Sequence, residues 1–218
     1  MAGTEYQGSD ERRTLAWPVL DYQWDNGWFA GTTNGIGYNI SDSQSMQYGL
    51  RITADLGRKE SRSSALRGMD DVDAKAAFGG FFNYALRPKF SLTSSLRYGA
   101  GQGGKGVIVD LGGAYSTQIA ALWRVGVGAG ISLANAEYMQ SFVGVTAAQA
   151  TASEYRAYTP KAGVRNGRVN LALTYMVSLR ASLTVGVTAN ALLGDAADSP
   201  LVRKETSVDG LLAAAYAF

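Results

Sequence analysis

The chain has 218 residues and a formal net charge of +2, and only 17% of its residues are charged. It contains no cysteine and no histidine, which excludes disulfides, thiolate nucleophiles, histidine-dependent hydrolytic triads and histidine metal sites. The weak charge argues against nucleic acid as a partner, and no apolar run reaches the ~18 residues of a membrane helix. We predict no catalytic, metal or cofactor site, and because no linker divides the sequence, residues 1–218 are expected to form one domain.

The amino-terminal part of the chain gives a weak pattern. Residues 1–13 are expected to be partly irregular, and they lack the basic region and apolar core of a signal peptide, so the exported form is expected to begin further upstream. Two strands are predicted over residues 14–24 and 28–40. Pro18 blurs the first strand because it cannot donate a hydrogen bond to a ladder, and Asn34 interrupts the apolar face of the second, which indicates a bulge.

From residue 46 onward, apolar residues alternate with small or polar residues, as in strands that face two different environments. The alternation is clearest in residues 122–135, where Trp123, Val125 and Val127 share one face and glycines occupy much of the other. The last predicted strand ends on Phe218, and an apolar terminus of this kind requires neighbouring strands and apolar surroundings. The predicted strands after residue 45 are residues 46–56, 74–87, 90–99, 107–116, 122–135, 168–177, 180–193 and 208–218.

A closed barrel in a lipid bilayer explains this alternation. A soluble lipocalin-like barrel also alternates, but its outward face would be rich in lysine and glutamate, whereas the second face here carries Gly, Ala, Ser and Thr with scattered charges. We therefore predict an all-β, transmembrane, antiparallel up-and-down β-barrel of about ten strands, or twelve, with short periplasmic turns and longer extracellular loops. The long extracellular loops are predicted over residues 57–73 and 136–167.

This orientation of the strands predicts two sets of side chains. Charged residues on the inner face would either pair across a narrow lumen or tune an anion-preferring pore, and pairing is favoured because a ten-stranded barrel is small. The predicted lumen charges are Arg51, Asp55, Lys75, Arg97, Asp110, Arg124, Arg168 and Asp209. Aromatic residues at one set of strand ends are typical of a girdle at the membrane interface. The predicted interface aromatics are Tyr48, Tyr84, Phe90, Tyr115, Trp123, Tyr175, Tyr216 and Phe218.

The predicted loop over residues 136–167 is too long to be a passive connection. Its middle, residues 145–158, is rich in alanine, which favours a short helix over a strand. We predict that the loop folds over or into the lumen, with Tyr155 and Tyr158 as anchors, so that the intact protein conducts poorly or not at all. The alternative is a mobile external loop that binds a partner or a host surface.

Two further patterns are better explained as ordinary loops. Residues 101–106 are glycine-rich like a phosphate-binding loop, but the Lys-Ser/Thr ending and the following helix are missing. Asp70, Asp71 and Asp73 lack the glycine and the distal glutamate of a calcium-binding loop, so a solvated acidic loop is expected.

Three stretches of the sequence resemble the MltA-interacting protein (MipA/OmpV) family of Gram-negative outer-membrane proteins. They are Tyr6-Gln-Gly-Ser9, Glu137-Tyr-Met-Gln-Ser-Phe-Val-Gly-Val145 with Gln149 and Tyr158 after it, and Leu192-Leu-Gly-Asp-Ala-Ala-Asp-Ser-Pro200. The terminal Tyr216-Ala-Phe218 also fits. The resemblance implies an outer-membrane barrel that acts as a scaffold between a lytic transglycosylase and a murein-synthesising penicillin-binding protein, and it brings no catalytic residues.

Three classes of function remain open. The first is a non-enzymatic scaffold or receptor, including an adhesin, whose partner surface would lie on the periplasmic turns or on the amino-terminal segment expected upstream. The second is a small porin-like diffusion channel that uses the basic lumen. The third, an enzyme, ranks last because the residues that membrane-embedded hydrolases commonly use are missing.

Overall fold

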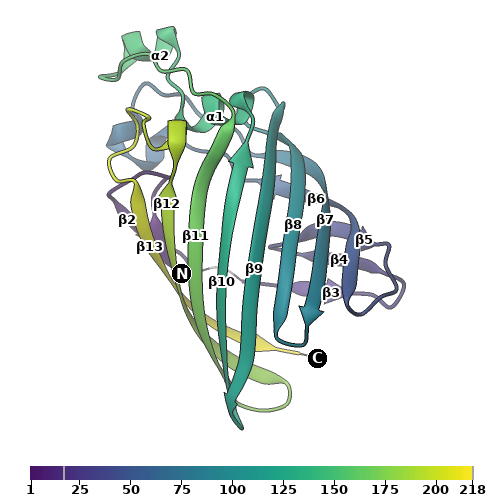
Figure 1. The fold of residues 1–218 in the computed structure, drawn as a ribbon. Coiled ribbons are helices and arrows are strands. Elements are labelled where there is room, and N and C mark those ends of the chain that lie inside the picture. The colour runs from purple at the N-terminus through teal and green to yellow at the C-terminus, as the bar shows by residue number, and fades with distance from the viewer. Residues whose placement is uncertain (17, 218) are drawn as a thin grey trace.

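The computed structural model describes residues 1–16 and 18–217, in which thirteen strands form one antiparallel sheet. The sheet is rolled into a barrel-like shape with two short helices at one end (Figure 1). Its strand order is β2-β1-β13-β12-β11-β10-β9-β8-β7-β6-β5-β4-β3. The two edge strands, β2 and β3, are consecutive in the chain and are joined by residues 15–20, and within the described ranges no ladder pairs one with the other.

Eight long strands make up most of the wall, and each corresponds to a strand predicted from the alternation. They are β6 (Met46–Asp55), β7 (Lys75–Arg87), β8 (Phe90–Ala100), β9 (Gly106–Ala120), β10 (Trp123–Ala134), β11 (Gly163–Met176), β12 (Ala181–Leu192) and β13 (Thr206–Tyr216). Strand β11 begins before the predicted residue 168, because residues 163–167 continue the ladder with β10 past a register shift opposite Ser132 and Leu133. The predicted loop boundary at residue 167 is therefore wrong.

The first forty residues differ more from the prediction. They form five short strands, β1 (Ala2–Thr4), β2 (Arg12–Thr14), β3 (Asp21–Gln23), β4 (Trp28–Gly31) and β5 (Gly35–Asn39). The predicted strand over 28–40 is a hairpin, since β4 and β5 pair with each other. Gly35 makes the reversal possible with a φ of +75°, and a Cβ there would lie 2.0 Å from the carbonyl oxygen of Ile52. The count of ten strands and the bulge at Asn34 are therefore wrong.

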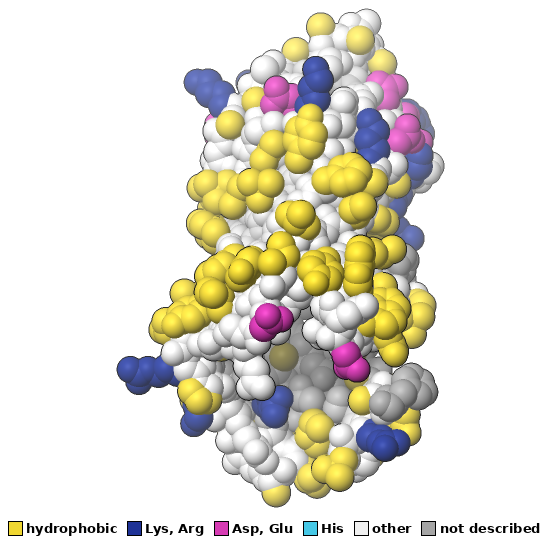
Figure 2. Space-filling view, turned by 90° about the vertical axis from the view of Figure 1, so that its right-hand side faces the viewer, with side chains coloured by type: hydrophobic (Ala, Val, Ile, Leu, Met, Phe, Trp, Pro, Cys, Tyr) yellow, Lys and Arg dark blue, Asp and Glu magenta, His cyan; other side chains and the backbone are white. Residues whose placement is uncertain are grey.

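The wall separates an apolar outer face from a small and polar inner face. Large hydrophobic side chains such as Leu50, Phe78 and Val185 are exposed on the outside, and Figure 2 shows hydrophobic side chains gathered across the face that it views. None of the described helices is long and apolar enough to cross a membrane. The alternation read from the sequence thus corresponds to the two faces of the sheet.

The two ends of the barrel differ in their connections. Short turns join β7 to β8, β9 to β10 and β11 to β12, and we call this end the turn end. The opposite end, called the loop end, carries the longer segments 56–74, 135–162 and 193–205. These segments contain α1 (Ala136–Val143), α2 (Ala147–Ala152) and three short 3-10 turns, η1 (Glu60–Arg62), η2 (Ser64–Leu66) and η3 (Gly194–Ala196). The buried core of the protein lies at the loop end.

Candidate functional site

Helix α1 lies at the loop end of the barrel (Figure 1). It begins at Asn135, whose side-chain oxygen accepts a hydrogen bond from the Tyr138 backbone N–H at 3.0 Å. Tyr138, Met139 and Val143 form its buried face. This face packs on strand residues Ala100, Ile108, Ala134 and Leu192, and on Ala196 of η3. Apolar burial therefore holds α1 between the strands.

Polar contacts complete the packing around α1. Arg58 is only 4% exposed, and its guanidinium donates to the carbonyl oxygens of Phe142 at 2.9 Å and Met69 at 3.3 Å. Arg165 lies over the ring of Tyr138 at 5.2 Å and donates to its hydroxyl at 2.9 Å. A buried guanidinium is costly unless it is hydrogen-bonded, so these contacts favour one defined arrangement of the loops.

The stretches that carry the family resemblance meet in this plug, which we define as α1 and the loop segments that bury it. The Tyr6 hydroxyl donates to the Leu201 carbonyl at 3.1 Å, and the Ser199 hydroxyl donates to the Val143 carbonyl at 2.6 Å. Gly8 accepts two hydrogen bonds, from the backbone N–H groups of Arg203 and Lys204. Burial raises the pKa of the Tyr6 phenol to about 12. Segments almost two hundred residues apart thus pack together at the loop end.

The second helix lies outside the plug core. Helix α2 falls within the predicted helical region 145–158, and a capping box between Thr146 and Gln149 fixes its start. Figure 1 shows α2 beyond α1 at the top of the molecule. The Tyr155 hydroxyl donates to the Ala65 carbonyl at 2.9 Å, and the Tyr158 hydroxyl donates to the Asp195 carbonyl at 2.8 Å. Both tyrosines therefore attach the loop to neighbouring segments.

Sequence reasoning missed α1, although a signal for it was present. Asn135 is a good N-cap residue, and Glu137 places an acidic side chain in the first turn. Tyr138, Met139, Phe142 and Val143 then recur at helical spacing.

Three of the predicted lumen charges meet on the inner wall. Asp110 of β9 accepts a hydrogen bond from Arg97 of β8 at 2.9 Å and lies 3.6 Å from Arg168 of β11. The Ser132 hydroxyl also donates to Asp110 at 2.6 Å. Neighbouring strands therefore bring one acidic and two basic side chains together.

The other predicted lumen charges lie apart from this cluster. Asp55 accepts from the Gly57 backbone N–H at 2.9 Å, Asp209 accepts from Asn190 at 2.8 Å, and Lys75 donates to the Gln102 carbonyl. Arg51 donates to Asn34 at 3.4 Å. Arg124 is exposed near the turn end and has no ion pair within the described ranges.

Replacing Asp110 by alanine should destabilise the barrel more than replacing Asp209 by alanine. The first change leaves two partly buried guanidinium groups without their carboxylate, at a cost of about 1–3 kcal/mol, whereas the second removes one hydrogen bond from a neutral amide. Denaturant titrations of the refolded protein give both free energies of unfolding. A larger loss for Asp209→Ala would contradict the assignment of Asp110 as the centre of the cluster.

The described interface aromatics lie on the outer face near the turn end. Phe90 packs on Tyr115 and Trp123 packs on Tyr175, each pair with ring centroids 4.8 Å apart on neighbouring strands. The remaining members are Tyr48, Tyr84 and Tyr216, which are exposed, and Phe218, which lies outside the described residues. Trp17 of the first predicted strand also lies outside them.

The structure also describes the acidic loop at residues 70–73 and the glycine-rich loop at residues 101–106. Lys59 lies 2.9 Å from Asp71 and 3.2 Å from Asp73, and its hydrogen bond lowers the pKa of the Asp71 carboxyl. No group of acidic residues in the described ranges could hold a metal ion. The glycine-rich residues 101–105 connect β8 to β9 and are followed by a strand instead of a helix.

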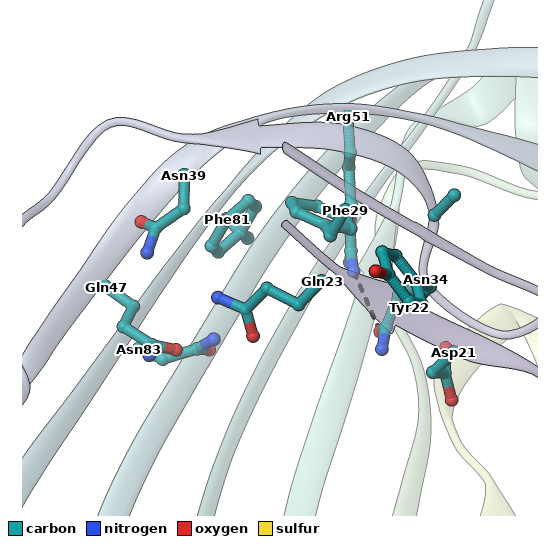
Figure 3. Close-up of a pocket in the computed structure, with 11 residues that line it drawn as sticks. Asp21, Tyr22, Gln23, Phe29, Asn34, Asn39, Gln47, Arg51, Phe81 and Asn83 are labelled. Atoms are coloured by element: carbon teal, nitrogen blue, oxygen red, sulfur yellow. Dashed lines mark hydrogen bonds between the residues drawn. The ribbon is translucent and has the colours of Figure 1, made fainter. Parts of the chain in front are cut away.

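A polar cavity of about 350 Å³ lies in the wall formed by β3–β7 (Figure 3). Its lining includes Arg51, two phenylalanines and several carboxamide side chains. Of the lining residues, the sequence analysis predicted Arg51 as a lumen charge and Asn34 as a bulge. The alternation on β6 and β7 could have indicated Gln47 and Asn83, because both occupy inner-face positions and the register places them directly opposite each other.

The comparisons with known proteins agree with this architecture. A solved structure described as "NanC porin structure in rhombohedral crystal form" is similar to this chain with a TM-score of 0.53 and 8% sequence identity, over 92% of this chain and 91% of that chain. The chain therefore has a porin-like β-barrel fold. A search of the curated proteins found no match. A family model described as "MltA-interacting protein MipA" matches residues 1–218, and the chain therefore belongs to the MipA family.

Proposed function

We propose that this protein is a non-enzymatic outer-membrane barrel, closed at its loop end, that acts as a scaffold for a murein lytic transglycosylase and a penicillin-binding protein. The observation that carries the proposal is the plug. Met139 and Val143 of α1 are only 1% and 2% exposed at the loop end of the barrel. Arg58 is also buried there and donates hydrogen bonds to the carbonyl oxygens of Phe142 and Met69. A packed end of this kind, in which the terminal nitrogens of a buried arginine are hydrogen-bonded, supports an anchor more than a conduit.

The alternative is a small diffusion channel with a basic lumen. Such a channel requires a continuous aqueous path, and α1 would have to leave the lumen to create one. Its buried side chains and the hydrogen bonds from Arg58 and Arg165 oppose that movement. The scaffold is therefore the better-supported function.

A partner surface for the scaffold lies at the turn end. Short turns are typical of the periplasmic side of outer-membrane barrels, where the murein enzymes work. Exposed basic side chains gather at the turns of β7–β12, namely Arg87, Lys89, Arg124 and Arg180. This basic rim suits a partner with an acidic surface.

Charge reversal at the turn end tests the scaffold. Purified protein carrying Arg87→Glu, Lys89→Glu and Arg180→Glu should lose binding to the lytic transglycosylase in a pull-down and in a surface-binding titration. The matched control carries Arg67→Glu, Lys105→Glu and Lys204→Glu, which reverses the same number of exposed charges at the loop end. Equal binding by the two triple variants would reject the turn end as the partner surface. Absence of binding by the unaltered protein would reject the scaffold itself.

A further inference from the structure

The cavity in the β3–β7 wall has the composition of a ligand site. Figure 3 shows Gln23, Asn39, Gln47 and Asn83 extending into the same space, with Arg51 on the far side. The turn-end part of β6 supplies Gln47, and Asn83 lies opposite it on β7. Figure 2, which views the molecule from the side of β3–β5, shows a hollow in the lower half of this face. The cavity volume of about 350 Å³ falls in the range of small-molecule sites, ~300–1,000 Å³.

The polar groups of this cavity are largely unused by the protein. Within the described part of the chain, the side chains of Gln23, Gln47 and Asn83 make no hydrogen bond. Asn39 accepts one from the Ser41 backbone N–H at 3.3 Å. The Nε of Arg51 is buried without a partner among the described residues. The carboxamides of Gln23, Gln47 and Asn83 together offer both donors and acceptors, which is what a ligand with several hydroxyl groups requires.

Two phenylalanines supply an apolar wall beside the amides. Phe29 and Phe81 pack edge to face with ring centroids 5.7 Å apart, and Arg51 lies 5.7 Å from the centre of the Phe81 ring. Glycines on the adjacent strands leave room for the rings. A Cβ at Gly37 would lie 2.4 Å from Phe29, and a Cβ at Gly49 would lie 3.0 Å from Phe81. The rings are thus held in place by the backbone of β5 and β6.

The charge of the lining favours an uncharged ligand. Arg51 and Asp21 are its only ionisable side chains apart from the Tyr22 phenol, and their formal charges cancel. We propose that this cavity binds a neutral saccharide of one or two rings. Its hydroxyl groups would pair with the carboxamides and Arg51, and an apolar C–H face would lie on Phe29 and Phe81.

A binding titration of the full chain in a detergent without a sugar headgroup tests this assignment. The probes are glucose, maltose and N-acetylglucosamine, with glucuronate and glucosamine as charged counterparts. Saturation-transfer NMR and calorimetry should show saturable binding of at least one neutral probe with a Kd on the order of 1–10 mM. The charged counterparts should bind more weakly.

Paired variants assign the binding to the cavity. Gln47→Ala with Asn83→Ala should weaken binding by about tenfold or more. The control, Thr184→Ala with Thr188→Ala, changes polar inner-face residues on β12 and should leave binding unchanged. Heat-modifiable mobility on gels verifies that both variants fold. The proposal is overturned by no saturable binding of a neutral probe, by preferred binding of glucuronate, or by binding that survives the Gln47 and Asn83 substitutions.

Discussion

Replacing residues 136–158 with a flexible Gly/Ser linker should raise the conductance of the barrel, which we expect to be closed in the unaltered protein. This change removes α1, whose buried face packs on the strand ends at the loop end, and it removes the acceptor of the Arg58 hydrogen bond at Phe142. The remaining loops lose their packing partners, so the end should open to water. Single-channel recording in planar bilayers is the measurement, and a clear rise above the conductance of the unaltered protein is the expected result.

The matched control replaces only α2, residues 147–152, with a linker of the same length. Our prediction from the sequence placed a short helix in the middle of the loop, but α2 lies beyond α1 and supplies no residue to the core cluster around α1. Ala150 of α2 packs instead against a separate cluster of Met69, Val145 and Leu201. The α2 replacement should therefore leave the barrel closed. If both replacements conduct equally, α1 is not the element that closes the barrel, and if neither conducts, the plug does not depend on this loop.

The eight long strands could be predicted because their two faces meet different surroundings. On β10, for example, the residues that point outward are apolar and those that point inward are small or polar. This period of two can be recognised in the sequence without knowing which strands are neighbours. The family, too, could be read from short stretches such as residues 137–145. Both signals are local in sequence.

The amino-terminal strands could not be predicted, since their structure depends on close approaches between distant backbones. The hairpin of β4 and β5 needs Gly35 to pass within contact of the Ile52 carbonyl on β6, and nothing near residue 35 reveals that neighbour. The β1–β2 hairpin is likewise held by β13, at the other end of the chain.

The candidate sites were only partly predictable for the same reason. Arg97, Asp110 and Arg168 were each expected on the inner face, but their meeting depends on the register of β8, β9, β10 and β11. The plug requires Tyr6, Val143 and Ser199 to come together across the whole chain. The cavity in the β3–β7 wall is lined in part by the short strands β3, β4 and β5. It could not be predicted, because these strands were not predicted with the correct number and bounds.

The outward-facing side chains of β10 are expected to contact lipid, and this predicts a large effect of a charged substitution on stability. Val127 lies near the middle of the strand, and its side chain is 43% exposed on the outer face. Replacing it by arginine would place a guanidinium against lipid, which costs about 2–4 kcal/mol near the midplane of a bilayer. Denaturant titrations of the protein folded into lipid vesicles should show this loss as a lower free energy of unfolding.

Gly126 provides the control for Val127→Arg on the neighbouring inner-face position. A Cβ at Gly126 would meet its nearest atoms at 4.0 Å, so Gly126→Ser should lower the free energy of unfolding far less. Gly128 is a poorer control, because a Cβ there would lie 2.6 Å from the Asn170 side chain and add a steric clash. The difference should shrink in detergent micelles, because a micelle lets water and headgroups reach the arginine more easily than a bilayer does. Equal losses for Val127→Arg and Gly126→Ser in vesicles would mean that the outer face of β10 does not meet lipid.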